Sequence, residues 1–248
     1  MRDPSLAAEH SPDAVRRRLG TPPSSSYLRD FIYGAIDGAV TTFAVVAGVE
    51  GAGLSASVVL ILGGANLLAD GFSMAVSNFL GLRAERQQLE RARREEERHV
   101  SLVPEGEREE IRQIFAAKGF EGEDLDRVVE VITADRDLWV STMLSEELGL
   151  GGAAPSPLRA GATTLLAFVV VGSFPLAAFV FDAIAPGGLE HAFAWSAVMT
   201  GVAFFAVGSL KARFVEQAWW RSGLETLAIG GVAALLAYAA GAFLESVV

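Results

Sequence analysis

The sequence predicts an all-α integral membrane protein with five transmembrane helices and a soluble helical insert. Hydrophobic residues make up 51% of the chain and the mean hydropathy is positive, yet charged residues still account for 20%. This composition indicates that the charge is segregated from the apolar segments. An acidic stretch over residues 83–152 lies between strongly apolar stretches. The soluble part is therefore expected to interrupt the membrane part.

The apolar segments are long enough for five membrane spans. A helix needs roughly 20 predominantly apolar residues to cross the hydrocarbon core of a bilayer. The segments that meet or approach this length are Phe31–Val49, Ser57–Leu82, Leu158–Ile184, Phe193–Leu210 and Leu224–Phe243. Pro175 predicts a kink in the third of them. The chain then divides into a tail (1–29), two spans (30–82), the insert (83–152) and three spans (153–248).

The distribution of Lys and Arg predicts which side of the membrane each loop occupies. Basic residues are concentrated in the tail, in the insert and in the connection after the fourth span, whereas the loops near Glu50 and Glu190 lack them. The tail contains Arg16, Arg17 and Arg18 but no apolar signal region, so we expect a disordered cytoplasmic tail. Five spans then place the insert in the cytoplasm and the carboxyl terminus outside.

The insert is predicted to form three helices. The first continues the second span, because residues 82–99 are dense in Glu, Arg, Gln and Ala, which are good helix formers. Pro104 suits the first position of the second helix, where no N–H is required. Apolar residues recur at helical spacing over residues 125–148, and Gly149 follows as a C-cap. The sequence therefore predicts an amphipathic bundle.

The net charge and the absence of cysteine restrict the partners. A net charge of -10 argues against nucleic acid, whose phosphates require Lys and Arg, and fits a cationic partner. Without cysteine the chain has no disulfide and no thiolate metal site. Carboxylate, imidazole and thioether groups are left as metal ligands, and this oxygen-rich set favours ions such as Fe(II) or Mn(II) over Cu(I).

Acidic residues and a histidine recur at helical spacing in the insert. Glu96 and His99 stand three positions apart, as do Glu107 and Glu110, so each pair projects from one helix face. With Glu147 they would form a carboxylate-rich shell of the kind that ferritin-like proteins use for iron or manganese. The same charges also fit a solvated stalk. Between positions 85 and 147, however, 18 acidic residues face 10 basic ones, and this surplus favours metal binding.

The first two spans each carry a polar stripe with a repeat of four residues. The stripes consist of Tyr33, Asp37 and Thr41 in the first span and of Asn66, Asp70, Met74 and Asn78 in the second. An ionisable group at such depth is costly unless it faces water, a partner or an ion. We therefore expect Asp37, Asp70 and Met74 to bind a metal ion in a pore. The alternative is that each carboxylate bonds a polar group of a neighbouring helix.

Four sequence motifs together resemble the vacuolar iron transporter family. They are Tyr33-Gly-Ala-Ile-Asp-Gly-Ala-Val-Thr-Thr-Phe-Ala-Val-Val-Ala-Gly, Ala69-Asp-Gly-Phe-Ser-Met-Ala, Met143-Leu-Ser-Glu-Glu-Leu-Gly-Leu and Gly223-Leu-Glu-Thr-Leu-Ala-Ile-Gly-Gly. The resemblance extends from Leu28 to the end of the chain. It implies a homodimer of five-span subunits with a pore between the two first spans. It also implies a cytoplasmic metal-binding insert and export of Fe(II) from the cytoplasm in exchange for protons.

The resemblance also assigns ligands by position and shows where this chain differs. It implies pore ligands at Asp37 and Met74, and insert ligands at Glu96, Glu107, Glu110, Met143 and Glu147. The chain departs from the family pattern at His99 and Asn78, where Glu is common, at Leu144, where a second Met is common, and at Asp70, where a small residue is common. These differences change the charge and softness of the ligands. Mn(II) and Zn(II) therefore join Fe(II) as candidate ions.

Two functions of different classes follow from these observations. The favoured one is a proton-coupled Fe(II) exporter, not an enzyme, that needs divalent metal ions, protons, a lipid bilayer and a second copy, with no further cofactor. The alternative is a membrane-tethered ferroxidase with a ferritin-like diiron site, which three helices are too few to build and which leaves Asp37 and Asp70 without a role. A metal sensor is a weaker third possibility. The expected location is the bacterial inner membrane, with the amino terminus and the insert in the cytoplasm.

Overall fold

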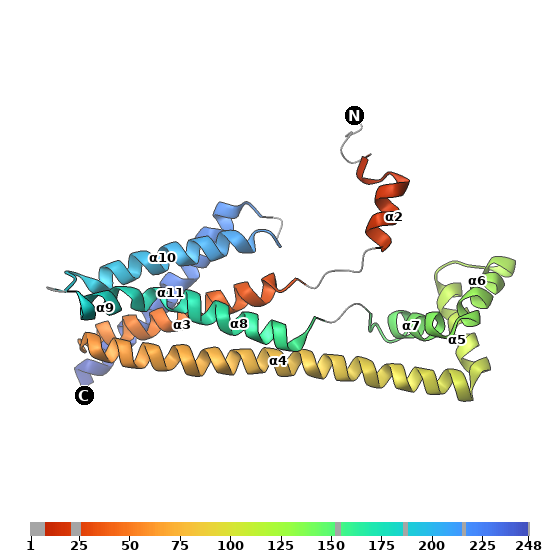
Figure 1. Cartoon of the computed structure of the whole chain (residues 1–248), viewed down its shortest axis with the longest axis horizontal. Helices are drawn as coiled ribbons and strands as arrows, with labels where there is room; N and C mark the ends of the chain where they lie inside the picture. Colours follow the sequence, from red (N-terminus) through yellow and green to blue (C-terminus); the bar gives the residue numbers. More distant parts are fainter. Residues whose placement is uncertain (1–7, 21–25, 152–154, 186–187, 215–216, 248) are drawn as a thin grey trace. The chain divides into compact units, whose positions relative to one another are not determined.

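The computed structural model describes residues 8–20, 26–151, 155–185, 188–214 and 217–247. These residues form helices and connections without a strand, so the all-α prediction is confirmed (Figure 1). The helices are α2 (Pro12–Gly20), α3 (Leu28–Gly51), α4 (Ala56–Leu102), α5 (Pro104–Ala117), α6 (Gly122–Ala134), α7 (Arg136–Glu146), α8 (Pro157–Gly172), α9 (Phe174–Ile184), α10 (Ala192–Lys211) and α11 (Trp219–Val247). The chain divides into a first unit, Met1–Ser25 with Leu82–Ala154, and a second unit, Ser26–Gly81 with Pro155–Val248.

The second unit contains the apolar helices. Helices α3, α4, α10 and α11 are each long and apolar enough to cross a membrane. Helices α8 and α9 pass the same test as a pair and are bent by 49° at the break between them. The described residues therefore hold four candidate spans, or five if the bent pair is one span. Pro175 lies in the first turn of α9, so the predicted kink is confirmed.

Helix α3 is the most enclosed of these candidate spans, because 56% of its apolar window is buried. It packs against α8, α9, α10 and α11. Gly34 and Gly38 face the backbone carbonyl groups of Thr164 and Phe168 on α8 so closely that no Cβ would fit. Small residues four positions apart let two membrane helices approach in this way. The contact fixes the rotation of α3 about its axis, and with it the direction in which Asp37 points.

The first unit is a small helical bundle around its own hydrophobic cluster. The end of α4 and the helices α5, α6 and α7 each contribute buried apolar side chains. Among the most deeply buried are Ile111 of α5, Val129 of α6, and Val140 and Met143 of α7. The amphipathic pattern of the insert therefore reflects a core of this unit.

The insert consists of four helical segments, so the prediction of three helices was wrong. The chain breaks at Asp135, whose backbone is extended with φ -113° and ψ 116°. Its carboxylate accepts hydrogen bonds from the backbone N–H groups of Asp137 and Leu138, which caps the amino end of α7. Ile132 and Trp139 face the same cluster on either side of this break. The apolar periodicity therefore continues across it and does not reveal it.

Helix α2 lies within the segment that was predicted to be a disordered tail. Asp13 stands in its first turn, and Arg17 and Arg18 stand in its last turn. These charges complement the dipole of the helix. Residues 1–7 and 21–25 of the predicted tail lie outside the described residues.

Candidate metal centre

The first unit contains a pocket of about 280 Å³ that is lined mainly by carboxylates. The lining residues are Ala92, Glu95, Glu96, His99, Glu107, Glu110, Glu147 and Leu148. The stalk part of α4 supplies the first four, α5 supplies the next two, and the last two follow directly after α7. Five residues that sequence spacing singled out as ligands of the insert thus border one pocket.

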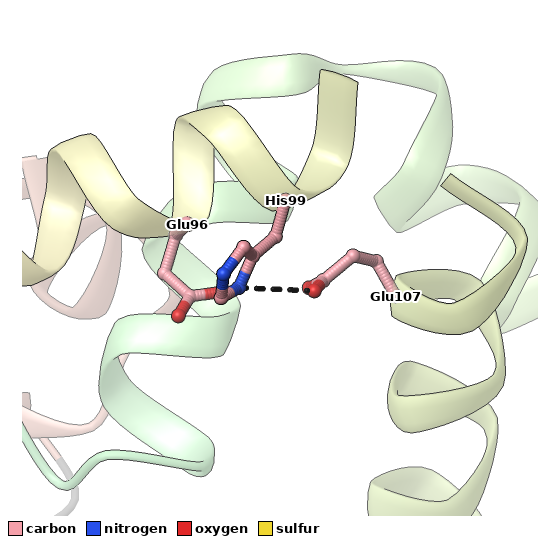
Figure 2. A group of neighbouring side chains, drawn as sticks. All are labelled: Glu96, His99 and Glu107. Atoms are coloured by element: carbon pink, nitrogen blue, oxygen red, sulfur yellow. Dashed lines mark ion pairs between the residues drawn. The ribbon is translucent and has the colours of Figure 1, made fainter. Parts of the chain in front are cut away.

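Three of these side chains lie close enough to share an ion. Glu96, His99 and Glu107 each offer a ligand atom, and the three atoms lie within 4.8 Å of one another. His99 Nδ1 is 3.5 Å from Glu107 Oε1 (Figure 2). Two ligand atoms about 2.1 Å from an ion can be at most about 4.2 Å apart. Small side-chain adjustments would therefore complete a three-ligand site.

The two glutamates are buried and incompletely bonded. Glu96 is only 5% exposed and Glu107 only 4%. The Oε2 atom of each has no hydrogen-bond partner among the described residues. A buried carboxylate without partners is costly, and each such case in a native protein requires an explanation. A cation in the pocket would provide the missing partner for both oxygens.

Burial also changes the acidity of the pocket. Burial raises the pKa of Glu107 to about 7, and the neighbouring carboxylates of Glu110 and Glu96 act in the same direction, whereas His99 opposes them. Burial is likewise the main cause of the raised pKa values of Glu96 and Glu147. Glu107 is therefore partly protonated near neutral pH, and a metal ion that binds there must displace this proton.

Metal binding is therefore expected to weaken as the pH falls below about 7, the pKa of Glu107. Each displaced proton lowers the apparent affinity about tenfold per pH unit below that pKa. The stability of the metal-free fold changes with pH in the opposite direction. The raised pKa of Glu107 destabilises the fold above pH 7, and this destabilisation is relieved as the pH falls toward 4.5, the pKa of the carboxyl group in the unfolded chain. Calorimetry of Mn(II) binding in buffers of different ionisation enthalpy counts the protons released. Binding without proton release between pH 5 and 7 would contradict this expectation.

Two side chains of this region differ in position from what the family resemblance and the helical spacing implied. Met143, a predicted ligand, has a fully buried side chain within the hydrophobic cluster and is not among the residues that line the pocket. Glu95 lines the pocket but was not singled out. It precedes His99 by four positions, so helical spacing could have identified it.

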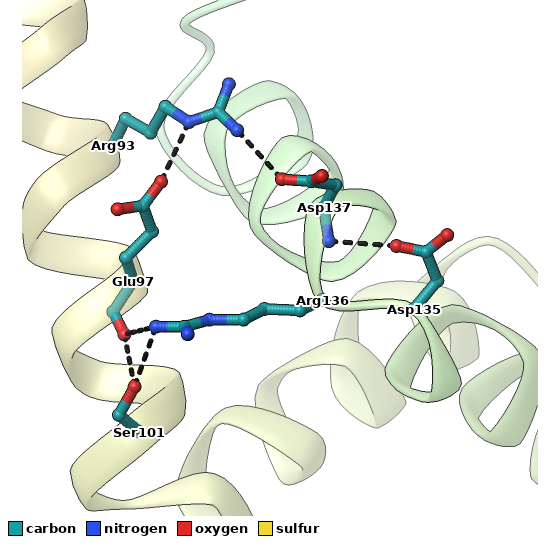
Figure 3. A network of polar contacts seen from close by, with 6 residues as sticks. All are labelled: Arg93, Glu97, Ser101, Asp135, Arg136 and Asp137. Atoms are coloured by element: carbon teal, nitrogen blue, oxygen red, sulfur yellow. Dashed lines mark hydrogen bonds and ion pairs between the residues drawn. The ribbon is translucent and has the colours of Figure 1, made fainter.

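A network of polar contacts fixes the amino end of α7 to the stalk part of α4 (Figure 3). Arg136 Nη2 donates hydrogen bonds to the backbone carbonyl of Glu97 and to Ser101 Oγ, both at 2.8 Å. Arg93 contacts the carboxylates of Glu97 and Asp137, both at 2.9 Å. Exposed contacts of this kind each contribute little stability. Together they set the position of α7, the helix after which Glu147 enters the pocket.

Polar residues of α3 and α4 hold the two predicted stripes together in the second unit. Asn66 Nδ2 of α4 donates to Thr41 Oγ1 of α3 at 3.3 Å. Three helical turns further along α4, Asn78 Nδ2 donates to Asp30 Oδ1 of α3 at 2.9 Å. The two stripes therefore lie side by side, with Asp70 and Met74 between these two levels of α4.

The three predicted pore ligands differ in exposure. Asp37 is partly buried, Met74 is partly buried against the hydrophobic core of this unit, and Asp70 is exposed. A charged group on the surface of an apolar span is costly in a bilayer unless water, a partner or an ion faces it. The stripe is therefore the part of the spans for which contact with lipid hydrocarbon is least favourable.

The fold and the pocket together define a class, a helical membrane protein with a separate unit suited to cations. The sequence matches the VIT family over residues 28–242. It is 36% identical over 254 residues to a vacuolar iron transporter of Toxoplasma gondii, covering 97% of this chain and 84% of that protein. It is 32% identical to vacuolar iron transporter 1 of Arabidopsis thaliana, and the match covers 85% of this chain and 83% of that protein. It is also 32% identical to vacuolar iron transporter 1 of Oryza sativa subsp. japonica, and that match covers 94% of this chain and 90% of the relative. The chain therefore belongs to the VIT family, the vacuolar iron transporters.

Proposed function

We propose that this protein is a proton-coupled transporter that carries Fe(II), with Mn(II) as a second cargo, out of the cytoplasm. The observation that supports this most directly is the pocket where two buried glutamate oxygens, on Glu96 and Glu107, have no hydrogen-bond partner in the described part of the chain. Relatives named iron transporters support metal-ion transport as the activity. The ion is captured in the pocket and then passes along the polar stripe of the spans.

The stripe supplies the transport step in this proposal. Asp37 and Asp70 offer oxygen ligands and Met74 offers a soft thioether, which together suit Fe(II). A carboxylate binds either a metal ion or a proton, so the same groups can exchange one for the other as the ion leaves. The exposure of Asp70 on the single chain supports a second copy facing the stripe. A homodimer would then enclose the path between two copies of α3.

The distribution of basic residues supports the direction of transport. Arg93 and Arg136 belong to the first unit, and Lys211 and Arg221 flank the connection between α10 and α11. Basic residues close to the ends of membrane spans favour the cytoplasmic side, which supports a cytoplasmic pocket. The relatives are named vacuolar iron transporters; in a bacterial inner membrane this orientation would release the ion outside the cell.

The ferroxidase alternative has no support among the relatives, which are named as transporters. The argument against it from helix number no longer applies, because the insert has four helical segments. Oxygen consumption separates the two activities. We expect Fe(II) oxidation no faster with the protein than in a metal-matched control, and metal flux in the absence of oxygen.

The experiment that tests the proposal is ion flux in proteoliposomes that contain the full-length protein. Fe(II), Mn(II) and Zn(II) are compared under anaerobic conditions, with and without an imposed pH gradient. We expect Fe(II) flux to rise when protons flow in the opposite direction and the internal pH to change as metal moves. Flux that ignores the pH gradient would remove proton coupling from the proposal, and absence of flux for all three ions would remove transport.

A further inference from the structure

His99 supplies the only nitrogen ligand among the described residues that line the pocket. The other polar side chains there are carboxylates, those of Glu95, Glu96, Glu107, Glu110 and Glu147. Carboxylates bind Mg(II), Ca(II) and Mn(II) well, and they do not separate these ions strongly from Fe(II). The single imidazole therefore gives the pocket its main chemical difference from an all-oxygen site.

No sulfur ligand lines the pocket in the part of the chain that the structure describes. The side chain of Met143 is 0% exposed. It packs in the hydrophobic cluster with Ile111 and Val140 and is absent from the pocket lining. A thioether contact would require Met143 to leave that core. Among the described residues that line the pocket, His99 is thus the only ligand softer than a carboxylate.

The position of His99 suits direct coordination. Its ligand atom lies within 4.8 Å of those of Glu96 and Glu107, and Figure 2 shows its ring between these two carboxylates. Both glutamates are more than nine-tenths buried, and each has an oxygen that no described residue hydrogen-bonds. The side chain of His99 is itself 45% exposed. An arriving ion can therefore meet the imidazole first and the buried oxygens afterwards.

We propose that His99 sets the metal selectivity of this pocket, favouring Fe(II), Co(II) and Zn(II) over Mn(II) and Mg(II). The reason is that imidazole is a good ligand for the first group, whereas the second group prefers oxygen. This proposal rests on the proposed function, which identifies the pocket as the site where the ion is captured. It adds that this chain discriminates at capture, before the ion reaches the spans.

The test compares metal affinities of the full-length protein in detergent under anaerobic conditions. Equilibrium dialysis gives the affinities for Fe(II) and Mn(II) in the wild type and in His99→Glu and His99→Gln. The matched control is His191→Asn, which changes an exposed histidine of the other unit at a left-handed position that asparagine tolerates. Pulsed electron paramagnetic resonance of the Mn(II)-loaded protein reports whether a nitrogen nucleus is coupled to the metal.

We expect the ratio of Fe(II) to Mn(II) affinity to fall at least about tenfold in His99→Glu, because groups that only support a metal ligand already contribute 10–100-fold. His99→Gln should weaken Fe(II) more than Mn(II), and His191→Asn should change neither. The nitrogen coupling should be present in the wild type and absent in both His99 variants.

Two results would overturn the proposal and leave the proposed function standing. One is an unchanged affinity ratio in both His99 variants. The other is a wild-type protein that binds Fe(II) no more tightly than Mn(II). A wild-type protein that binds neither ion would overturn this inference and the capture step of the proposed function together.

Discussion

Replacing Asp37 with asparagine is expected to abolish metal flux while leaving metal binding in the pocket intact. The substitution keeps the size and shape of the side chain and removes its charge. A cation at the depth of a membrane span then loses its counter-charge, and a charge at that depth costs about 3 kcal/mol, which corresponds to roughly a hundredfold in rate. Flux in proteoliposomes and calorimetry of the same preparation measure the two properties separately.

Glu50→Gln provides the matched control for this experiment. Glu50 is an exposed carboxylate on the same helix, α3. It follows Asp37 by 13 positions, which places it about 140° away around the helix. This variant should transport at the wild-type rate. An Asp37→Asn protein that also transports at the wild-type rate would show that the stripe does not carry the ion.

Replacing Glu107 with glutamine is expected to have opposite effects on metal binding and on stability. Removing a direct ligand should lower the affinity for Mn(II) or Fe(II) by at least about a hundredfold. Removing a buried carboxylate with a pKa raised to about 7 should stabilise the metal-free unit above that pH. Calorimetry measures the affinity, and hydrogen exchange of α5 at pH 8 measures local opening.

Glu109→Gln is the control on the same helix, because the Glu109 carboxylate is 56% exposed and contacts Arg112. It should leave the affinity and the exchange rates of α5 close to those of the wild type. A Glu107→Gln protein in which α5 opens faster would assign Glu107 a structural role. Unchanged metal affinity would exclude Glu107 as a ligand.

The membrane part of the fold could be predicted closely from the sequence because span length and apolar content follow from the thickness of a bilayer. The break in the third apolar segment could also be predicted, because proline ends a helix for steric reasons. The division between α6 and α7 could not. It depends on the Asp135 carboxylate meeting two backbone N–H groups, a local contact that leaves the apolar periodicity unchanged.

The candidate site was predictable in its parts but not in its assembly. Helical spacing placed Glu96 with His99 and Glu107 with Glu110 on common faces. It could not show that two separate helices bring these faces to one pocket, because that depends on tertiary packing. The depth of burial and the contacts of Arg136 with α4 were hidden for the same reason. The contribution of Glu147 also depends on where the chain leaves α7.

The volume of the pocket, about 280 Å³, has a consequence for how long an ion stays. A water position needs roughly 10–15 Å³ in such a cavity, so a bound ion would share the space with several waters. An ion that keeps part of its hydration shell has open positions, as in metal sites that exchange ligands, whereas structural sites are closed by protein groups. An incoming ligand can then attach before the previous ones depart. A site of this kind is expected to exchange its ion quickly and not to store it.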